Sequence, residues 1–175
     1  MTLADFTSPG MIVPRLRGRD AATVIQELAA AMQQEGRAPD GESLCRAALN
    51  RELLGGTDME DGMAFPHARL AGLSELSFAL GRSDGPLDWR AGTARPVRLV
   101  FLLAVPAMDI TQYLRLISGL ARLSKDGPLV KQLHAAQDAP SIIELLRQVE
   151  LRAGATSVPA KPAATQSPTG FLVEP

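Results

Sequence analysis

The chain has 175 residues, of which 46% are hydrophobic and 21% are charged, and its formal net charge is -1. This length suits one compact domain with a sizeable apolar core. The balanced charge and an aromatic content of only 4% argue against the basic stripe and the stacking platforms that nucleic-acid-binding proteins use.

The N-terminus, MTLADFTSPG, has neither the basic start nor the apolar stretch of a secretory signal. The longest apolar run, Leu99 to Pro106, is far shorter than a membrane span. Cys45 is the single cysteine, so no internal disulfide can form, which is typical of a reducing compartment. We therefore expect a cytoplasmic protein with no membrane insertion.

The first half of the chain predicts two helices. Asp20 is a candidate N-cap for a helix that continues to Gly36, and Asp40 for a second helix that runs through Ser43 to Leu54. The apolar residues recur at helical spacing. In the first helix they are Ala21, Val24, Ile25, Leu28, Ala29 and Met32, and in the second Leu44, Ala47, Ala48 and Leu49.

The middle of the chain predicts strands. Residues 57–73 lack periodicity and are interpreted as a loop, a short strand and a loop. Residues 75–81 alternate in the manner of a half-buried strand, with Leu76, Phe78 and Leu80 on one face. Residues 83–92 are rich in turn formers. Residues 97–105 form a nearly continuous apolar run, which predicts a central strand covered on both faces.

The C-terminal part predicts three helices, over residues 109–123, 128–136 and 140–151. The last begins with Pro140 and a Ser141-x-x-Glu144 capping pattern. After Ala153 the composition changes to Ala, Pro, Thr and Ser, so we expect a domain over 1–153 and a disordered tail over 154–175. Alternating helices and strands indicate an α/β fold with a mixed sheet.

Two histidines, His67 and His134, are candidates for chemistry. His134 lies in a helical stretch, which favours an ordinary helix-face residue. His67 follows Pro66 and several glycines, and proline would hold the histidine in a defined direction. A neutral imidazole nitrogen is a suitable nucleophile for phosphoryl relay. On this local context alone, a histidine beside a proline is nevertheless more often structural.

Other chemistries are poorly supported. Two distant histidines and one cysteine do not supply the ligands of a metal site, and no cofactor is indicated. Cys45 fits a small buried residue better than a nucleophile. The G-x-x-x-x-G-K-[ST] and G-x-G-x-x-G patterns of nucleotide-binding proteins are both missing. Arg51, at the end of the second helix, is either a solvated charge or a ligand for an anion near the glycine loop.

A family resemblance favours the functional interpretation of His67 over the structural one. The stretches at residues 51–57 (RELLGGT), 62–70 (GMAFPHARL), 96–106 and 113–116 closely resemble the IIA domain of the bacterial phosphoenolpyruvate-dependent phosphotransferase system. The resemblance is to the fructose–mannitol class, including its nitrogen-related regulatory branch, and covers roughly residues 10 to 150. It implies a three-layer α/β/α sandwich around a mixed sheet.

The resemblance also implies roles for individual residues. His67 would accept a phosphoryl group from an HPr-type phosphocarrier, and Arg51 would lie beside that group, where a guanidinium can form two hydrogen bonds. Thr57 would add a hydroxyl or N–H contact. Tyr113 occupies the place of the family's second active-site histidine, and a phenol can donate a hydrogen bond but carries no positive charge near neutral pH.

Two functions follow as expectations. The first is a phosphotransferase-system IIA component, a stoichiometric relay rather than an independent catalyst. It would take the phosphoryl group on His67 and pass it to a IIB component or use it as a regulatory signal. The alternative is a non-transferring regulatory binding module that controls a transporter or kinase, which the presence of Tyr113 motivates.

Overall fold

A five-stranded mixed sheet forms the middle layer of the protein. The computed structural model describes residues 1–57, 61–90, 96–108 and 110–152. The elements, in chain order, are η1 (Leu3–Phe6), η2 (Pro9–Met11), β1 (Ile12–Val13), α1 (Ala21–Gln34), α2 (Gly41–Leu54), β2 (Met63–Ala64), β3 (His67–Leu70), β4 (Ser77–Leu87), β5 (Val97–Pro106), α3 (Ile110–Lys125), α4 (Gly127–Ala135) and α5 (Ala139–Arg147).

Strands β4 and β5 pair antiparallel at the centre of the sheet. β1 runs parallel to β4 on one side, and the short strands β2 and β3 both run parallel to β5 on the other. In this register His67, the first residue of β3, pairs with Leu103. β3 therefore lies at an edge of the sheet, beside the interior strand β5.

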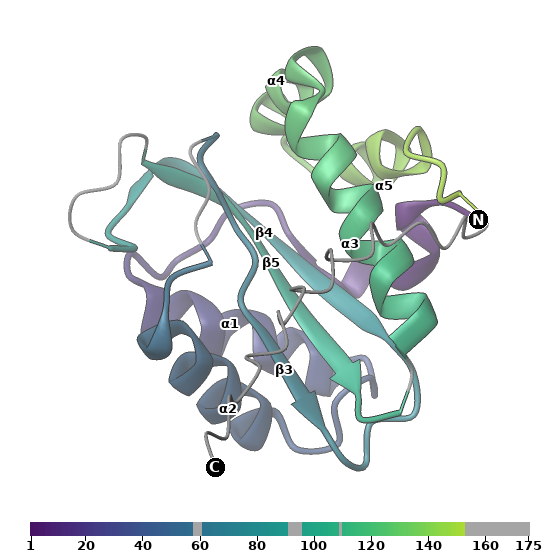
Figure 1. The fold of residues 1–175 in the computed structure, drawn as a ribbon. Helices are drawn as coiled ribbons and strands as arrows, with labels where there is room; N and C mark the ends of the chain where they lie inside the picture. The colour runs from purple at the N-terminus through teal and green to yellow at the C-terminus, as the bar shows by residue number, and fades with distance from the viewer. Residues whose placement is uncertain (58–60, 91–95, 109, 153–175) are drawn as a thin grey trace, which may run out of the picture.

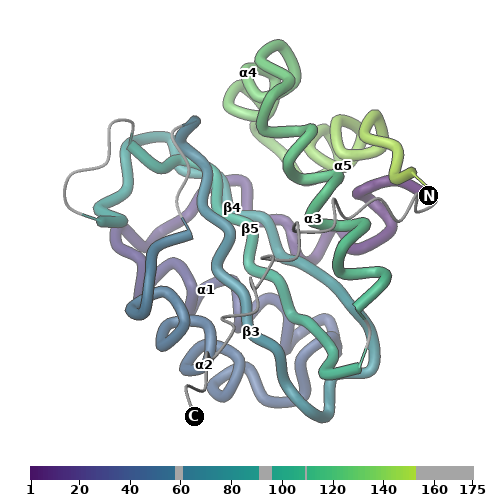
Figure 2. The backbone as a smooth tube through the Cα atoms, in the orientation of Figure 1, coloured from purple at the N-terminus to yellow at the C-terminus, as the bar shows by residue number. Residues whose placement is uncertain are grey.

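Helices cover both faces of the sheet (Figure 1). α1 and α2 pack on one face through one apolar cluster, and α3, α4, α5 and η1 pack on the other through a second cluster. This arrangement confirms the predicted three-layer α/β/α sandwich. The start of the chain lies beside the end of α5 (Figure 2), where Leu3 N donates to Val149 O at 3.1 Å.

The first two helices begin as the sequence predicts. Asp20 accepts a hydrogen bond from Thr23 N at 2.8 Å, and Asp40 accepts one from Ser43 N at 3.1 Å. These side chains satisfy backbone donors that have no partner inside the helix. Within the described residues no helix has the length and apolar character needed to cross a membrane.

The predicted capping pattern of the last helix is wrong. Asp138, rather than Ser141, is the N-cap of α5, and its side chain accepts from Ser141 N at 2.8 Å. Asp is as good an N-cap as Ser, and Glu144 pairs with Arg147 along the helix instead. α5 also ends at Arg147, earlier than the predicted 151.

The two long strands differ in how well the sequence predicts them. β5 is covered on both faces, as its apolar run indicates. β4 is longer than expected and is buried on both faces over residues 77–83, so the half-buried interpretation is wrong. Its second face carries small residues such as Ala79 and Gly81, which pack toward the α1 side against residues including Leu16.

The segment around His67 also differs from its prediction. Residues 63–70 form two short strands, β2 and β3, rather than one. Each is held by hydrogen bonding to β5, a partner far away in sequence, so local periodicity does not reveal it. η1, η2 and β1 have no counterpart in the sequence-based prediction. The predicted tail, 154–175, lies outside the described residues.

Candidate functional site

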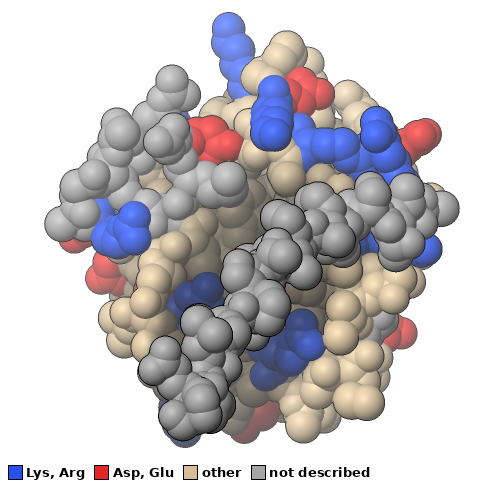
Figure 3. Space-filling view, in the orientation of Figure 1, with Lys and Arg blue, Asp and Glu red and all other residues tan. Residues whose placement is uncertain are grey.

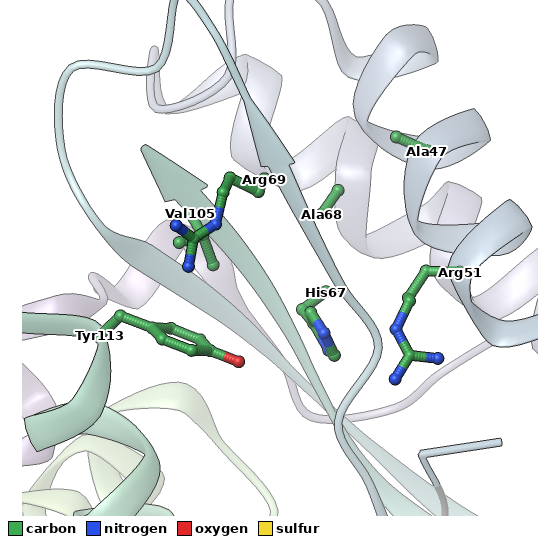
Figure 4. A pocket seen from close by; sticks show the side chains of 7 residues that line it. All are labelled: Ala47, Arg51, His67, Ala68, Arg69, Val105 and Tyr113. Carbon is green, nitrogen blue, oxygen red and sulfur yellow. The ribbon is translucent and has the colours of Figure 1, made fainter. Parts of the chain in front are cut away.

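An open pocket of about 280 Å³ lies at the β3 edge of the sheet, between the α2 layer and the α3 layer. Its lining residues come from four elements, as Figure 4 shows: Ala47 and Arg51 from α2, His67, Ala68 and Arg69 from β3, Val105 from β5 and Tyr113 from α3. The pocket therefore brings together three of the four predicted site residues: His67, Arg51 and Tyr113.

His67 is half-buried, and its ring is held by the backbone. Nδ1 lies 3.0 Å from Phe65 O. A carbonyl oxygen can only accept a hydrogen bond, so this contact selects the tautomer in which Nδ1 carries the proton. Nε2 then keeps its lone pair and is the nucleophilic nitrogen of the ring.

The chain before His67 is fixed at several points. Pro66 has a restricted φ, and its carbonyl accepts from Leu103 N at 2.9 Å, which anchors it to β5. Gly62, with φ +82, turns the chain into β2, and a Cβ there would lie 3.0 Å from Pro96 O. The glycine is required because other residues rarely adopt this conformation. His67 thus projects from a rigid segment.

Two arginines give the pocket a cationic character. Arg51 stands in the last turn of α2, and its Nη1 donates to Gly55 O at 3.1 Å. Arg69 lies two residues after His67, on the same side of β3, with its guanidinium carbon 5.6 Å from the Tyr113 ring centroid. No acidic residue lines the described part of the pocket, and basic side chains show in the hollow between the layers in Figure 3.

Tyr113 faces His67 across the pocket. Their ring centroids are 6.4 Å apart and their planes are inclined by 45°. In Figure 4 the hydroxyl of Tyr113 points toward His67, while Arg51 lies on the other side of the histidine. The pocket therefore offers one nucleophilic nitrogen, two guanidinium groups and one phenol to an anionic group.

Thr57 does not line the pocket. Its hydroxyl donates to Glu52 Oε2 at 2.7 Å and accepts from Phe65 N at 3.2 Å. The contact between Thr57 and a phosphoryl group, which the family resemblance implies, stays a prediction. Thr57 instead holds the N–H of Phe65, the residue whose carbonyl contacts the His67 ring.

The remaining candidates lie elsewhere. Cys45 is half-buried on α2, and burial and the nearby Glu42 raise the pKa of its thiol, which makes it a weaker nucleophile. His134 lies on α4, where burial and then Arg98 and Arg82 lower its pKa. Among the described residues, no three His, Cys, Asp or Glu side chains are grouped to hold a metal ion.

Comparison with known proteins identifies the family. The model of the family described as phosphoenolpyruvate-dependent sugar phosphotransferase system, EIIA 2, matches residues 5–149. The chain belongs to this EIIA family. A nitrogen regulatory protein of Bradyrhizobium diazoefficiens is 33% identical over 147 residues, which cover 83% of this chain and 95% of that protein.

Other relatives include sugar transport components. The fructose-specific EIIABC component of Bacillus subtilis is 27% identical over 148 residues, which are 85% of this chain and only 23% of that longer protein. Among solved structures, the nitrogen regulatory protein IIA-Ntr from Neisseria meningitidis has a TM-score of 0.71 at 22% identity, covering 82% of this chain and 98% of that chain. The Escherichia coli complex of IIAMTL with phosphorylated IIBMTL gives 0.67 at 15% identity, covering 79% and 95%. At these identities, the structural likeness supports the EIIA fold alone.

Two residues at or behind the pocket, Arg69 and Glu52, are missing from the sequence-based prediction. Arg69 would follow from strand parity, because residues two apart share a face of a strand. The prediction gives one short strand within residues 57–73 without bounds, so it does not place His67 and Arg69 on one strand. Glu52 stands directly after Arg51 and accepts hydrogen bonds from Thr57 and from Trp89, which is distant in sequence. No local pattern reveals the bond to Trp89.

Proposed function

We propose that this protein is a phosphoryl carrier of the phosphoenolpyruvate-dependent phosphotransferase system. It accepts a phosphoryl group from an HPr-type phosphocarrier on Nε2 of His67. It then passes the group to a IIB component or uses its own phosphorylation state as a signal. The protein acts as a stoichiometric relay, because each transfer leaves it chemically changed until the next one.

One observation carries this proposal. His67 Nδ1 is bound to Phe65 O, so Nε2 is the nitrogen left free, and the pocket around the ring contains Arg51 and Arg69. Phosphoryl transfer depends on positioning and charge stabilisation more than on covalent chemistry by the protein. Guanidinium groups suit a phosphoryl dianion, because they donate paired hydrogen bonds and keep their charge.

The chemical step requires no proton transfer. The lone pair of Nε2 forms the new bond to phosphorus as the bond between phosphorus and the phosphocarrier breaks. The His67 ring gains positive charge, and Phe65 O, the acceptor for Nδ1–H, stabilises that charge. Arg51 and Arg69 stabilise the negative charge on the phosphoryl oxygens, and Tyr113 can donate one further hydrogen bond.

The surface beside the pocket supports docking of a protein partner. The last turn of α2, which carries Arg51, also exposes Leu53 and Leu54, and the start of α3, which carries Tyr113, exposes Ile110 and Leu114. Exposed apolar side chains grouped beside a functional site are typical of protein interfaces. We assign this rim to the HPr-type phosphocarrier and to the acceptor that follows it, and place the exchange in the cytoplasm.

Incubation with phosphoenolpyruvate, enzyme I and HPr tests the proposal. The native protein should acquire an acid-labile phosphoryl group, and nitrogen NMR of the labelled ring should place it on Nε2. His67→Ala should abolish labelling, whereas His134→Ala, which changes the other histidine, should label at the native rate. No label on the native protein would refute the phosphoryl carrier.

A second function is favoured by a specific observation. The relative that is 33% identical is named a nitrogen regulatory protein, and Tyr113 offers no charge of its own to assist onward transfer. In this alternative the protein is a non-transferring regulatory module that binds a transporter or kinase. Phosphorylated protein that fails to donate to any IIB component, but binds a partner differently in its two forms, would favour this function.

A further inference from the structure

The carboxylate of Glu52 is the centre of a hydrogen-bond network behind the pocket. Oε1 accepts from Thr57 N at 2.8 Å and from the Trp89 indole Nε1 at 2.7 Å, and Oε2 accepts from the Thr57 hydroxyl at 2.7 Å. Glu52 and Thr57 are half-buried and Trp89 is buried. A carboxylate that accepts three short hydrogen bonds is held firmly, because the negative charge of the carboxylate strengthens each bond.

Thr57 connects this carboxylate to the histidine segment. Its hydroxyl has a single hydrogen, which it donates to Glu52, and its lone pair accepts from Phe65 N at 3.2 Å. Phe65 N also lies 3.3 Å from Thr57 O, so both Thr57 acceptors hold the same N–H. While Glu52 is ionised and bonded in this way, the Thr57 hydroxyl has no hydrogen left for a phosphoryl oxygen.

Phe65 completes the connection to the reactive ring. Its N–H is held by Thr57, its ring stacks on Phe101 with centroids 5.3 Å apart, and its carbonyl accepts from His67 Nδ1 at 3.0 Å. The residue between them, Pro66, has a restricted φ. The position of Phe65 O therefore depends on contacts at both ends of the residue.

We propose that Glu52 and Thr57 are positioning residues for His67. By holding Phe65 at its N–H they fix the position of Phe65 O, and with it the tautomer that has a proton on Nδ1 and a free lone pair on Nε2. The inference deepens the proposed function, because that tautomer presents the nucleophile to the phosphocarrier. It also gives Thr57 a role different from direct contact with the phosphoryl group.

Matched variants test the proposal in the full chain. Thr57→Val keeps the size of the side chain and removes the hydroxyl, whereas Thr57→Ser keeps the hydroxyl. Glu52→Gln removes the charge and replaces one acceptor by a donor. Glu42→Gln is the control, since Glu42 lies exposed on the same helix and pairs with Arg46. Trp89→Phe removes a single donor and gives a milder change.

The primary measurement is the tautomer of unphosphorylated His67, from nitrogen NMR of the labelled imidazole at a pH where the ring is neutral. We expect the native protein, Thr57→Ser and Glu42→Gln to show Nδ1–H. Thr57→Val and Glu52→Gln should show a mixture of both tautomers, and Trp89→Phe a smaller shift in the same direction. Phosphorylation by phospho-HPr should slow by about 10-fold or more in the first two, as misplaced reacting groups do.

Each outcome decides between positioning and simple structural support. If Thr57→Val, Glu52→Gln and Trp89→Phe unfold more easily but keep the native tautomer in the folded state, the positioning role is wrong. The tautomer measurement needs no phosphoryl donor. A tautomer shift in these variants would therefore uphold the inference even if the native protein took no label and the proposed function failed.

Discussion

The two histidines of this protein lie in contrasting surroundings. His67 stands at the sheet edge, with Nδ1 bound to Phe65 O and with its ring in an open pocket. His134 lies on α4, and its Nδ1 is buried without a hydrogen-bond partner among the described residues. The backbone carbonyl of His134, rather than its ring, is hydrogen-bonded: it accepts from Arg82 Nε at 2.8 Å.

The arginines near the two histidines differ in the same way. Arg51 and Arg69 are exposed and line a pocket. Arg82 is only 3% exposed and is bonded to the carbonyls of His134 and Pro14 and to the Asp84 carboxylate. The same residue types therefore line an open pocket, which we propose as the phosphorylation site, at His67. At His134 their donors form hydrogen bonds within the fold.

The largest expected effect is on the structural side of this comparison. Arg82→Ala should lower the free energy of unfolding by about 3 kcal/mol, because it leaves two carbonyls and a carboxylate without their donor. Urea denaturation measures this change. The rate of His67 phosphorylation in the folded fraction should stay unchanged.

Arg15 provides the matched control. It is exposed and approaches the same carboxylate, with Arg15 Nε 3.9 Å from Asp84 Oδ2. Arg15→Ala should change the free energy of unfolding by about 0.5 kcal/mol or less, as exposed ion pairs do. An equal loss in the two variants would show that burial does not separate these arginines.

The next effect is on the reactive side. Arg51→Ala and Arg69→Ala should each slow phosphorylation of His67 by about 10- to 100-fold, the worth of a hydrogen bond to a charged group. Arg51→Lys should reduce the phosphorylation rate less, since lysine keeps the positive charge but cannot donate two parallel hydrogen bonds. Single-turnover kinetics with phospho-HPr give these rates.

Stability should respond little to the same changes. Arg46→Ala, on the solvent side of α2 and paired with Glu42, serves as the control and should leave the phosphorylation rate at the native value. A native phosphorylation rate in Arg69→Ala would show that Arg69 does not stabilise the phosphoryl group and that Arg51 alone does so.

Tyr113 should contribute less than the arginines. Tyr113→Phe removes one neutral hydroxyl and keeps the ring that lies beside Arg69, so we expect a loss of about threefold in the phosphorylation rate. Tyr113→Ala also removes the ring and should lose more. Equal losses in the two variants would place the whole contribution in the hydroxyl.

Elements that local interactions determine are predictable from the sequence, whereas elements that depend on distant partners are not. α1 and β5 are predictable because their signals are local: helical spacing after the Asp20 cap, and a continuous apolar run. β2 and β3 are too short for a periodic signal, and their pairing partner β5 lies more than thirty residues away along the chain, as for His67 and Leu103. Tertiary pairing, not local preference, creates those strands.

The candidate site divides along the same line. The sequence motif identifies His67 and Arg51, and the structure places both in one pocket. The motif does not predict a role for Arg69, because that role depends on which residues of β3 share a face. It does not predict a role for Glu52 either, because that role depends on hydrogen bonds from Thr57 and Trp89. Arg69 and Glu52 also stand in the family-like stretches 51–57 and 62–70, but their contacts with Tyr113 and Trp89 appear only in the folded chain.

The smallest expected effect concerns pH and the ring of His134. Burial, with Arg98 and Arg82 nearby, lowers its pKa from the ordinary value of 6.5. On acidification the unfolded state therefore binds a proton at this residue before the folded state does. The free energy of unfolding should fall as the pH drops through the pKa that His134 has in the unfolded state.

His134→Gln removes this contribution, so the stability of the variant should fall less than that of the native protein between neutral and mildly acidic pH. Urea denaturation across that range measures the difference. Parallel curves for the two proteins would show that the His134 ring is as easily protonated in the fold as in the unfolded chain.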